Sequence, residues 1–414
     1  MKIKIRKRYL FYVLAFTSAI IAAIGAGIDT ITEHLMGDVW ALCLSCFIIG
    51  ATVSIVFGLL LSIPFKDKRL GSIIDPSFQG VRLIKKEEIK YHALSGFGNS
   101  ILTIGYFFLL AHFKDPTIVL PFSQVVILYL IVIESVTEKN TPTFIEIQSA
   151  IIITFGAILG SLTSVGSSID LWALMIVFLV INPGWVLLSI YQRKLKRLKI
   201  NKKSNDAINI RLWNVIFAVI FTAIIMYALD LINNTNTVIA GINASFEFTG
   251  WLTLVAIATF FGFTFYIRAL GIGKASVTQA VRSSIIIFSI PVTIAISYFL
   301  GIGSFESDPM FLLIKFIGIT IMLLGIISFA LTLTKAYIFI KMKPGQPIEE
   351  TIKKLWAIRG VNRITVVAGH YDFIIKIRTR TLVKGYERIL RKVQEVPGIA
   401  KYQWQSVLKE WEDI

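Results

Sequence analysis

An arginine lies inside an apolar segment of this sequence, where a charge is costly. Arg282 follows Lys274 by eight residues, so it lies roughly 12 Å into a helix that starts there. A buried charge at that depth in a membrane is destabilising unless it faces a cavity or a partner, which makes a functional role the first hypothesis. Its planar guanidinium is suited to a two-pronged contact with a carboxylate or phosphate. Two other readings stay open: Arg282 pairs with an acidic side chain to lock helices together, or the helix starts later.

Other polar and aromatic residues could join Arg282 in a substrate-binding site. Gln279 and Ser283 share its helical face, because residues three and four apart lie on one stripe. The other candidates lie in further apolar segments and are Tyr106, Tyr266, Ser123, Gln124, Asn99, Asn182 and Trp185. The last two belong to Asn182-Pro-Gly-Trp185, which must interrupt the helical hydrogen-bond ladder, and broken helices line sites in many transporters. Polar side chains also hold membrane helices together, so a structural role stays open for each.

No pattern in the sequence indicates catalysis or metal binding. The two cysteines, Cys43 and Cys46, lie in an apolar run without further ligands nearby, which favours small buried side chains over a redox or metal site. Paired carboxylates, an activated nucleophile and a phosphate-binding loop are all missing. We therefore expect no enzyme activity, no catalytic residue, no cofactor and no metal.

Composition shows what must position these residues. The chain has 414 residues, 55% of them hydrophobic, and a mean hydropathy of +0.74, so lipid must be the solvent for most of it. Runs long enough to span a bilayer recur along the chain. The ten segments predicted to be transmembrane helices are 9–28, 39–64, 91–113, 116–136, 143–164, 170–190, 209–229, 250–270, 275–300 and 310–334.

Basic residues predict the orientation of these helices. Lys and Arg concentrate in 2–8, 66–90 and 193–203, whereas the alternate loops 29–38, 165–169, 230–249 and 301–309 have none. Cytoplasmic loops carry the excess of basic residues, so we expect a multi-pass cell-membrane protein with both termini in the cytoplasm. The net charge of +17 is then accounted for by basic residues beside anionic lipid headgroups, and we expect no nucleic-acid partner.

The sequence also contains an internal repeat. Residues 103–130 align without gaps to 263–290, and Tyr106 matches Tyr266. This divides the membrane part into repeats of about 1–165 and 166–335. Because each half holds an odd number of helices, the halves must be inverted, as in many secondary transporters that bind substrate between the halves.

The last 79 residues, 336–414, are charged and alternate between two periodicities. They predict strands at 336–342, 361–368, 372–378 and 401–408, and helices at 347–358 and 381–396. The order β-α-β-β-α-β is the ferredoxin-like layout. The fold class is thus an α-helical membrane protein with a C-terminal α+β domain, divided at 1–335 and 336–414.

The first 335 residues resemble the EamA-like branch of the drug/metabolite transporter superfamily. The resemblance is carried by breaks that bear Lys or Asp, acidic residues at far helix ends, glycine-spaced helices and a proline, namely 115–121, 274–279, Glu138, Glu306, Gly156, Gly160, Gly318, Gly325 and Pro291. Both Glu134 and Glu138 are candidates for the family's acidic residue. This likeness implies ten helices in two inverted repeats and transport of small metabolites.

The tail resembles the amino-acid-binding regulatory domain of Lrp/AsnC-type transcription regulators. The likeness rests on the run Gly369-His370-Tyr371-Asp372, the strand after it, and 396–399. It implies a domain that dimerises and binds small effectors, commonly amino acids, at those four residues. The alternative is that Gly369 only permits the turn. The DNA-binding helix-turn-helix that usually precedes such a domain is replaced here by membrane helices.

These observations lead to one functional hypothesis and one rival. We expect a secondary transporter of a small metabolite, an amino acid or an organic anion, which works by alternating access. A cytoplasmic amino-acid-sensing domain would regulate it and hold it as a homodimer. The rival is a membrane-anchored effector sensor without transport activity.

Overall fold

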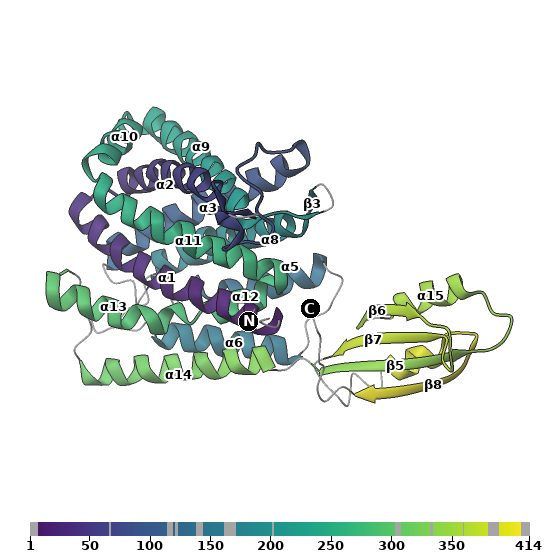
Figure 1. Cartoon of the computed structure of the whole chain (residues 1–414). Helices are drawn as coiled ribbons and strands as arrows, with labels where there is room; N and C mark the ends of the chain where they lie inside the picture. The colour runs from purple at the N-terminus through teal and green to yellow at the C-terminus, as the bar shows by residue number, and fades with distance from the viewer. Residues whose placement is uncertain are drawn as a thin grey trace.

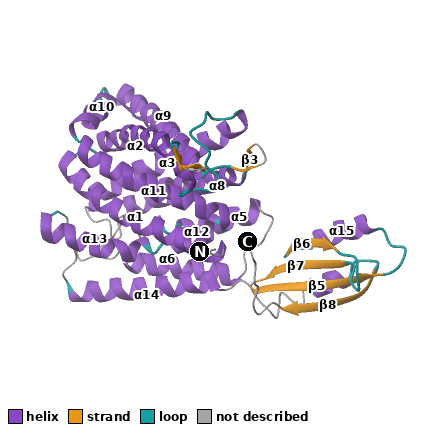
Figure 2. Cartoon of the chain, viewed as in Figure 1, coloured by secondary structure: helices purple, strands orange, loops and turns teal. Residues whose placement is uncertain are grey.

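The structure is a computed structural model in which a helical region is followed by an α/β domain (Figures 1 and 2). It describes residues 7–65, 68–113, 119–120, 123–137, 144–160, 171–200, 203–302, 308–331, 334–358, 360–379 and 389–406.

Apolar helices build the first region. They are α1 (Lys7–Met36), α2 (Val39–Leu61), α3 (Lys86–Phe113), α5 (Val126–Thr137), α6 (Phe144–Gly160), α7 (Leu171–Ile176), the π-helical turn η2 (Val177–Ile181), α8 (Asn182–Arg197), α9 (Ala207–Asn233), α10 (Thr237–Glu247), α11 (Thr249–Ile272), α12 (Ala275–Arg282), α13 (Ile285–Leu300) and α14 (Pro309–Leu331). Among the described residues, seven segments are long and apolar enough to cross a membrane: Tyr9–Met36, Val39–Leu61, Lys86–Phe113, Ala207–Asn233, Thr249–Ile272, Ala275–Leu300 and Pro309–Ser328. This number indicates a multi-pass membrane protein.

Three further predicted spans, 116–136, 143–164 and 170–190, overlap α5, α6 and α7–α8 but are not among these seven. Two loop predictions were wrong, because α1 continues to Met36 and the segment 230–249 contains α10. Polar residues remain helical at the end of α1 because their hydroxyls donate to helix carbonyls, Thr30 to Ala26 at 2.9 Å and Thr32 to Ile28 at 2.8 Å. Such bonds satisfy a side chain without ending the helix.

Helices far apart in sequence lie side by side in the bundle (Figure 1). The main packed pairs are α6 with α14, α1 with α11, α3 with α8 and α9, and α2 with α9 and α11. Glycines allow the closest approaches: a Cβ on Gly184 would lie 2.8 Å from the Gly98 carbonyl oxygen, and one on Gly156 would lie 2.6 Å from that of Gly318. Small residues serve this purpose in membrane helices, which gives Gly184 a packing role.

Short polar loops close one end of the bundle through β1 (Pro64–Phe65), β2 (Lys68–Arg69), the 3-10 turn η1 (Leu70–Ser72), β3 (Lys199–Ile200) and β4 (Lys203–Ser204). Lys196 Nζ lies 2.6 Å from Asp75 Oδ2, and Arg82 bonds Glu88 at 2.7 Å. Burial opposes ionisation of Asp75, but the Lys196 ammonium and the backbone amides of Ala207 and Ser77 together lower the pKa of Asp75. These paired charges fix the loops to each other.

The tail forms a four-stranded antiparallel sheet in the order β6-β7-β5-β8. Its elements are β5 (Thr334–Met342), α15 (Ile348–Trp356), β6 (Val361–Val366), β7 (Phe373–Thr379), a helix within 389–394 and β8 (Ile399–Ser406). Ile338, Phe373, Ile375 and Leu355 belong to its core, all within the tail itself. The first and third strands are central, as the βαββαβ layout requires. The predicted turn at 369–372 lies in the short connection 367–372 between β6 and β7, which is closed by a hydrogen bond from the Val367 amide to Asp372 O at 3.0 Å.

Candidate functional site

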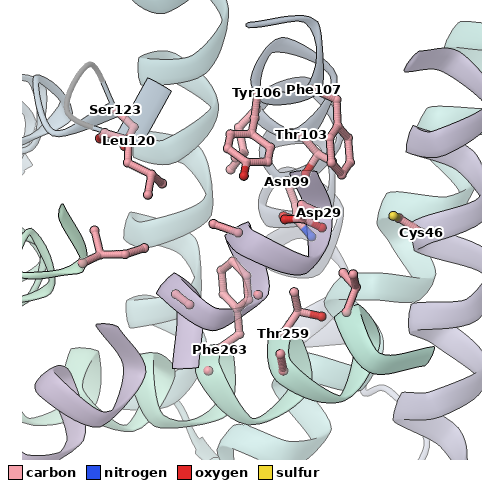
Figure 3. Close-up of a pocket in the computed structure, with 18 of the residues that line it drawn as sticks. Asp29, Cys46, Asn99, Thr103, Tyr106, Phe107, Leu120, Ser123, Thr259 and Phe263 are labelled. Carbon is pink, nitrogen blue, oxygen red and sulfur yellow. Dashed lines mark hydrogen bonds between the residues drawn. The ribbon is translucent and has the colours of Figure 1, made fainter. Parts of the chain in front are cut away.

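A cavity of about 150 Å³ lies among the helices of the first region. Residues of α1, α2, α3, α8, α9, α11 and α12 line it, together with residues of 119–124 (Figure 3). Of the residues predicted to bind substrate, those on its wall are Arg282, Tyr106, Ser123, Gln124, Asn99 and Trp185. The helical bundle therefore brings six residues from four predicted helices to one cavity.

Arg282 reaches the cavity because its helix stops there. It is the last residue of α12, and a turn at Ser283 and Ser284 precedes α13. Its side chain is only 6% exposed, and its guanidinium carbon lies 4.8 Å from the ring centre of Trp185 and 5.1 Å from that of Tyr266. Its Nε has no hydrogen-bond partner among the described residues, and none of their acidic groups forms an ion pair with it.

A second arginine on the cavity wall was not among the predicted site residues. Arg211 of α9 is 4% exposed, and its guanidinium carbon lies 4.4 Å from the ring centre of Phe263. In the part of the chain that the structure describes, its Nε and Nη1 find no hydrogen-bond acceptor. It lies within the predicted span 209–229, two residues from its start, and was given no role. The signal that could have found it is that α9 begins at Ala207, one turn earlier.

Asp29 also lines the cavity and was also missed. The sequence interpretation ended the first helix at residue 28, whereas α1 carries Asp29 inside the bundle at 8% exposure. Its carboxylate lies next to Tyr106 (Figure 3). Its Oδ1 has no donor in regular hydrogen-bond geometry among the described residues. The cavity thus holds two buried cations and one buried carboxylate.

Aromatic contacts alone do not offset the burial of these arginines. A cation–π contact contributes about 0.5–2 kcal/mol, whereas an arginine at the centre of a membrane helix costs at least about 2.5–3.5 kcal/mol. Arg211 and Arg282 lack carboxylate partners among the described residues, and each guanidinium lies against at least one aromatic ring. A shortfall of this kind is typical of a site that an anion completes.

Two predicted site residues turn away from the cavity and hold the helices together. Gln279 and Ser283 are fully buried but do not line it. The Ser283 hydroxyl donates to Gln124 Oε1 at 2.8 Å, and Gln279 Nε2 donates to the same oxygen at 3.2 Å. Gln124 Nε2 in turn donates to Leu120 O at 3.0 Å. This network joins the turn after α12 to the turn before α5.

Three further candidates have partners or positions that indicate structural roles. The Tyr266 hydroxyl shares a 2.7 Å hydrogen bond with Ser189 Oγ. Asn99 Nδ2 donates to Asn214 Oδ1 at 3.0 Å, although Asn99 also faces the cavity. Asn182 is fully buried off the cavity, and neither its Nδ2 nor its Oδ1 has a partner within the described residues. It follows η2 directly, so the predicted interruption of the ladder takes the form of a π-helical turn.

A buried ion pair positions α12. Glu134 Oε1 accepts from Arg193 Nη1 at 2.8 Å and from the backbone amide of Ala275 at 2.7 Å, and Oε2 accepts from Ser276 Oγ at 2.5 Å. A carboxylate at a helix N-terminus satisfies backbone donors that would otherwise be unpaired. Of the two acidic candidates, Glu134 therefore anchors the helix that presents Arg282, while Glu138 lies outside the described residues.

The four predicted effector residues lie in the connection between β6 and β7. Asp372 Oδ2 accepts from the Met342 amide at 2.7 Å, so its carboxylate joins β7 to the end of β5. His370 is exposed and lies against Tyr371, whose ring centre is 5.4 Å from that of Phe339. A Cβ on Gly369 would meet nothing within 4 Å, and its φ is not positive. Neither packing nor backbone strain therefore requires glycine at 369.

Comparisons with known proteins bear on the tail. The family described as Lrp/AsnC ligand binding domain matches residues 335–413, so the tail is a small-ligand-binding domain of this type. No curated protein matches the chain. A solved structure titled "Crystal structure of protein" aligns with 77% of this chain and 95% of its own at 12% identity, with a TM-score of 0.46, which is too low to bear on the fold.

Proposed function

We propose that this protein is a secondary transporter of a small metabolite that carries an acid group, an amino acid or an organic anion, and that its tail regulates transport. The observation that carries the proposal is the cavity among the helices, on whose wall the buried Arg282 contacts aromatic rings and forms no ion pair with the described acidic residues. Such a site binds a small molecule away from water, as transporters do near the bilayer midplane. No catalytic step is part of the proposal.

Helix packing supports ten membrane helices in two inverted repeats of an EamA-like type. The repeat would relate the first predicted helix to the sixth and the third to the eighth. It would therefore exchange the pair α1–α11 with the pair α8–α3, and both pairs are packed along their length (Figure 1). It would map α6–α14 and α2–α9 onto themselves, and these pairs are packed as well.

Two broken helices give the repeat further support. At the offset of 160 residues, Gln124-Val125 corresponds to Ser284-Ile285. Gln124 and Val125 form a turn directly before α5, and Ser283 and Ser284 form the turn between α12 and α13. The two turns are joined by the hydrogen bond from Ser283 to Gln124. Discontinuous helices that meet at the midplane are where repeat transporters bind substrate.

The proposed topology places both termini in the cytoplasm and 230–249 outside. The measurement is labelling of intact cells with an impermeant maleimide, after Cys43 and Cys46 are replaced by alanine. Asn233→Cys, exposed at the end of α9, should be labelled from outside, because the loops without Lys or Arg face outward. Lys199→Cys, exposed in a basic loop, is the matched control and should be labelled only after permeabilisation. The reverse pattern would overturn the charge argument.

The tail is proposed to bind an amino acid and to dimerise. Side chains alternate along β5, so Tyr337 and Phe339 lie on the sheet face opposite the tail core, where Tyr371 contacts Phe339. An aromatic sheet face of this kind is suited to a second copy of the domain. Effector binding would then favour one conformation of the transporter by binding it more tightly.

Removing 334–414 should leave basal flux and abolish its response to the effector. The cut lies before β5, because a truncation that retained this central strand would expose Ile338 and Ile340, which are fully buried in the tail. Coupling between two sites is typically worth about 1–3 kcal/mol, or about 5- to 150-fold in affinity. Flux with an amino-acid panel on the cytoplasmic side measures the response in the full chain and in the truncated one.

Point variants locate the effector site within the tail. His370→Ala should weaken amino-acid binding to the isolated 334–414, whose core is self-contained, and calorimetry measures this. Lys392→Ala, an equally exposed position on a helix, is the control and should bind as the wild type. If the isolated tail is monomeric and binds no amino acid, the regulatory proposal fails.

Flux into proteoliposomes tests the transport proposal and separates it from its rival. Purified full-length protein should exchange a radiolabelled amino acid or organic anion across the vesicle membrane without ATP. The membrane-anchored sensor predicts effector binding by the tail and no flux of any compound. Absence of flux across a broad panel, with effector binding intact, would favour the sensor.

A further inference from the structure

Two guanidinium groups of the cavity share one aromatic ring. The guanidinium carbon of Arg211 lies 4.4 Å from the ring centre of Phe263, and that of Arg282 lies 5.5 Å from it. The two carbons are thus no farther apart than the sum of these distances, 9.9 Å. The two arginines come from different helices, α9 and α12, so the fold, and not neighbouring sequence, brings them together.

Like charges this close repel each other in a medium of low dielectric constant. Among the described residues, the acidic groups near them do not offset this repulsion. Glu134 is bonded to Arg193 and to the start of α12, and Asp29, on the cavity wall, forms no ion pair with either arginine. Both guanidinium groups keep nitrogen atoms without an acceptor there: Nε in each case, and also Nη1 of Arg211.

The rest of the wall limits what can neutralise these charges. Most of it is apolar, and its few neutral polar groups come from residues such as Thr103, Thr259 and Asn99. Thr103 and Asn99 lie near Asp29, and Thr259 lies with Phe263 on α11 (Figure 3). A space of about 150 Å³ has the size for a small molecule and not for a folded peptide.

We propose that the substrate is a small organic dianion, whose two negative charges are bound by Arg211 and Arg282. The inference rests on the proposed function, because it takes the cavity to be the substrate site. Two anionic groups a few bonds apart, as in a short dicarboxylate, would each meet one guanidinium. A phosphate monoester, with two charges on one group, would place both arginines on the same phosphate.

Binding to the purified full-length protein tests this without relying on flux. The probes are succinate and butyrate, which have four carbons each but two acid groups and one, and glycerol 3-phosphate with glycerol as its uncharged partner. Thermal unfolding in detergent at neutral pH gives an apparent Kd for each probe. We expect a Kd for succinate or glycerol 3-phosphate at least about tenfold lower than that of its partner, since a charge-assisted contact contributes at least that factor.

Variants assign the preference to the two arginines. Arg211→Gln and Arg282→Gln should each bring the Kd for the preferred dianion close to that of its partner. Arg211→Lys, which keeps the charge, should retain part of the preference. Arg268→Gln is the control, because Arg268 lies on α11 outside the cavity wall, and it should keep the full preference. The comparison of probes on the wild type stays decisive even if a variant fails to fold.

Each outcome separates this inference from the proposal of transport. The dianion inference is overturned if a dianion and its partner bind equally well. It is also overturned if neither dianion binds up to about 10 mM, a concentration above the usual range of KM values. Flux of monoanions or cations without a preference for dianions keeps transport and rejects the dianion. Binding of a dianion with no flux keeps the dianion and rejects transport. Preference for succinate or for glycerol 3-phosphate identifies which form of dianion the site accepts.

Discussion

Replacing Arg282 with alanine should abolish flux while the protein remains folded. If the guanidinium binds an acid group of the substrate, its loss costs about 2–5 kcal/mol, or about 30-fold to several-thousand-fold in transport efficiency. Stability should be maintained or improved, because the variant removes a buried charge that has no acidic partner among the described residues. Initial rates in proteoliposomes and thermal unfolding of the same preparation measure both quantities.

Two further variants separate binding from structure at this position. Arg282→Lys should restore flux only in part, because a point charge cannot reproduce a planar two-pronged contact. Arg268→Ala should transport as the wild type, since Arg268 does not line the cavity. A purely structural role for Arg282 predicts a lower melting temperature with flux reduced in proportion. Full activity of Arg282→Ala would remove it from the site.

Replacing Glu134 with alanine should destabilise the helical region by about 3–5 kcal/mol, the cost of breaking a buried ion pair from one side. The variant leaves the Arg193 guanidinium without its carboxylate and the amides of Ala275 and Ser276 without their acceptor. Because α12 presents Arg282, substrate affinity should fall as well. Thermal or denaturant unfolding in detergent measures the loss.

A double-mutant cycle tests whether Glu134 and Arg193 act as a unit. Glu134→Ala with Arg193→Ala should cost less than the sum of the two single changes, by about 0.5–3 kcal/mol, because no charge is then left buried and unpaired. Glu247→Ala, at an exposed residue of α10, is the control and should change stability little. Additive single effects would show that the pair is not coupled.

The helical region was predictable because apolar runs and basic loops are strong signals, and Arg282 stood out because it lies within such a run. Arg211 and Asp29 were missed for the opposite reason. Each lies near the end of an apolar run, where a charge looks like part of a loop. Hydropathy does not tell where a helix ends when hydroxyl groups, such as that of Thr30, bond back to the helix.

Which residues of α12 line the cavity could not be predicted from their spacing. Spacing placed Gln279, Arg282 and Ser283 on one stripe, but only Arg282 lines the cavity. The other two meet Gln124, a contact that depends on how the turns before α5 and after α12 approach each other. In the tail, the order of strands and helices along the chain was predictable from the alternation between strand and helix periodicity in the sequence. The bond from the Met342 amide to Asp372 did not, because it depends on how the ends of β5 and β7 are placed.

The link between the two regions is shorter than its position at a domain boundary suggests. Helix α14 ends at Leu331 and β5 begins at Thr334, so two residues join a membrane helix to the central strand of the tail. The three Cα–Cα steps from Leu331 to Thr334 span at most about 11 Å, which keeps the start of β5 close to the end of α14. Two tails paired through their aromatic sheet faces would therefore fix the distance between the two α14 helices attached to them. A rotation of one tail against the other would then tilt α14 relative to α6, on which it packs. An effector bound at the tails would reach the helical region through the orientation of this helix.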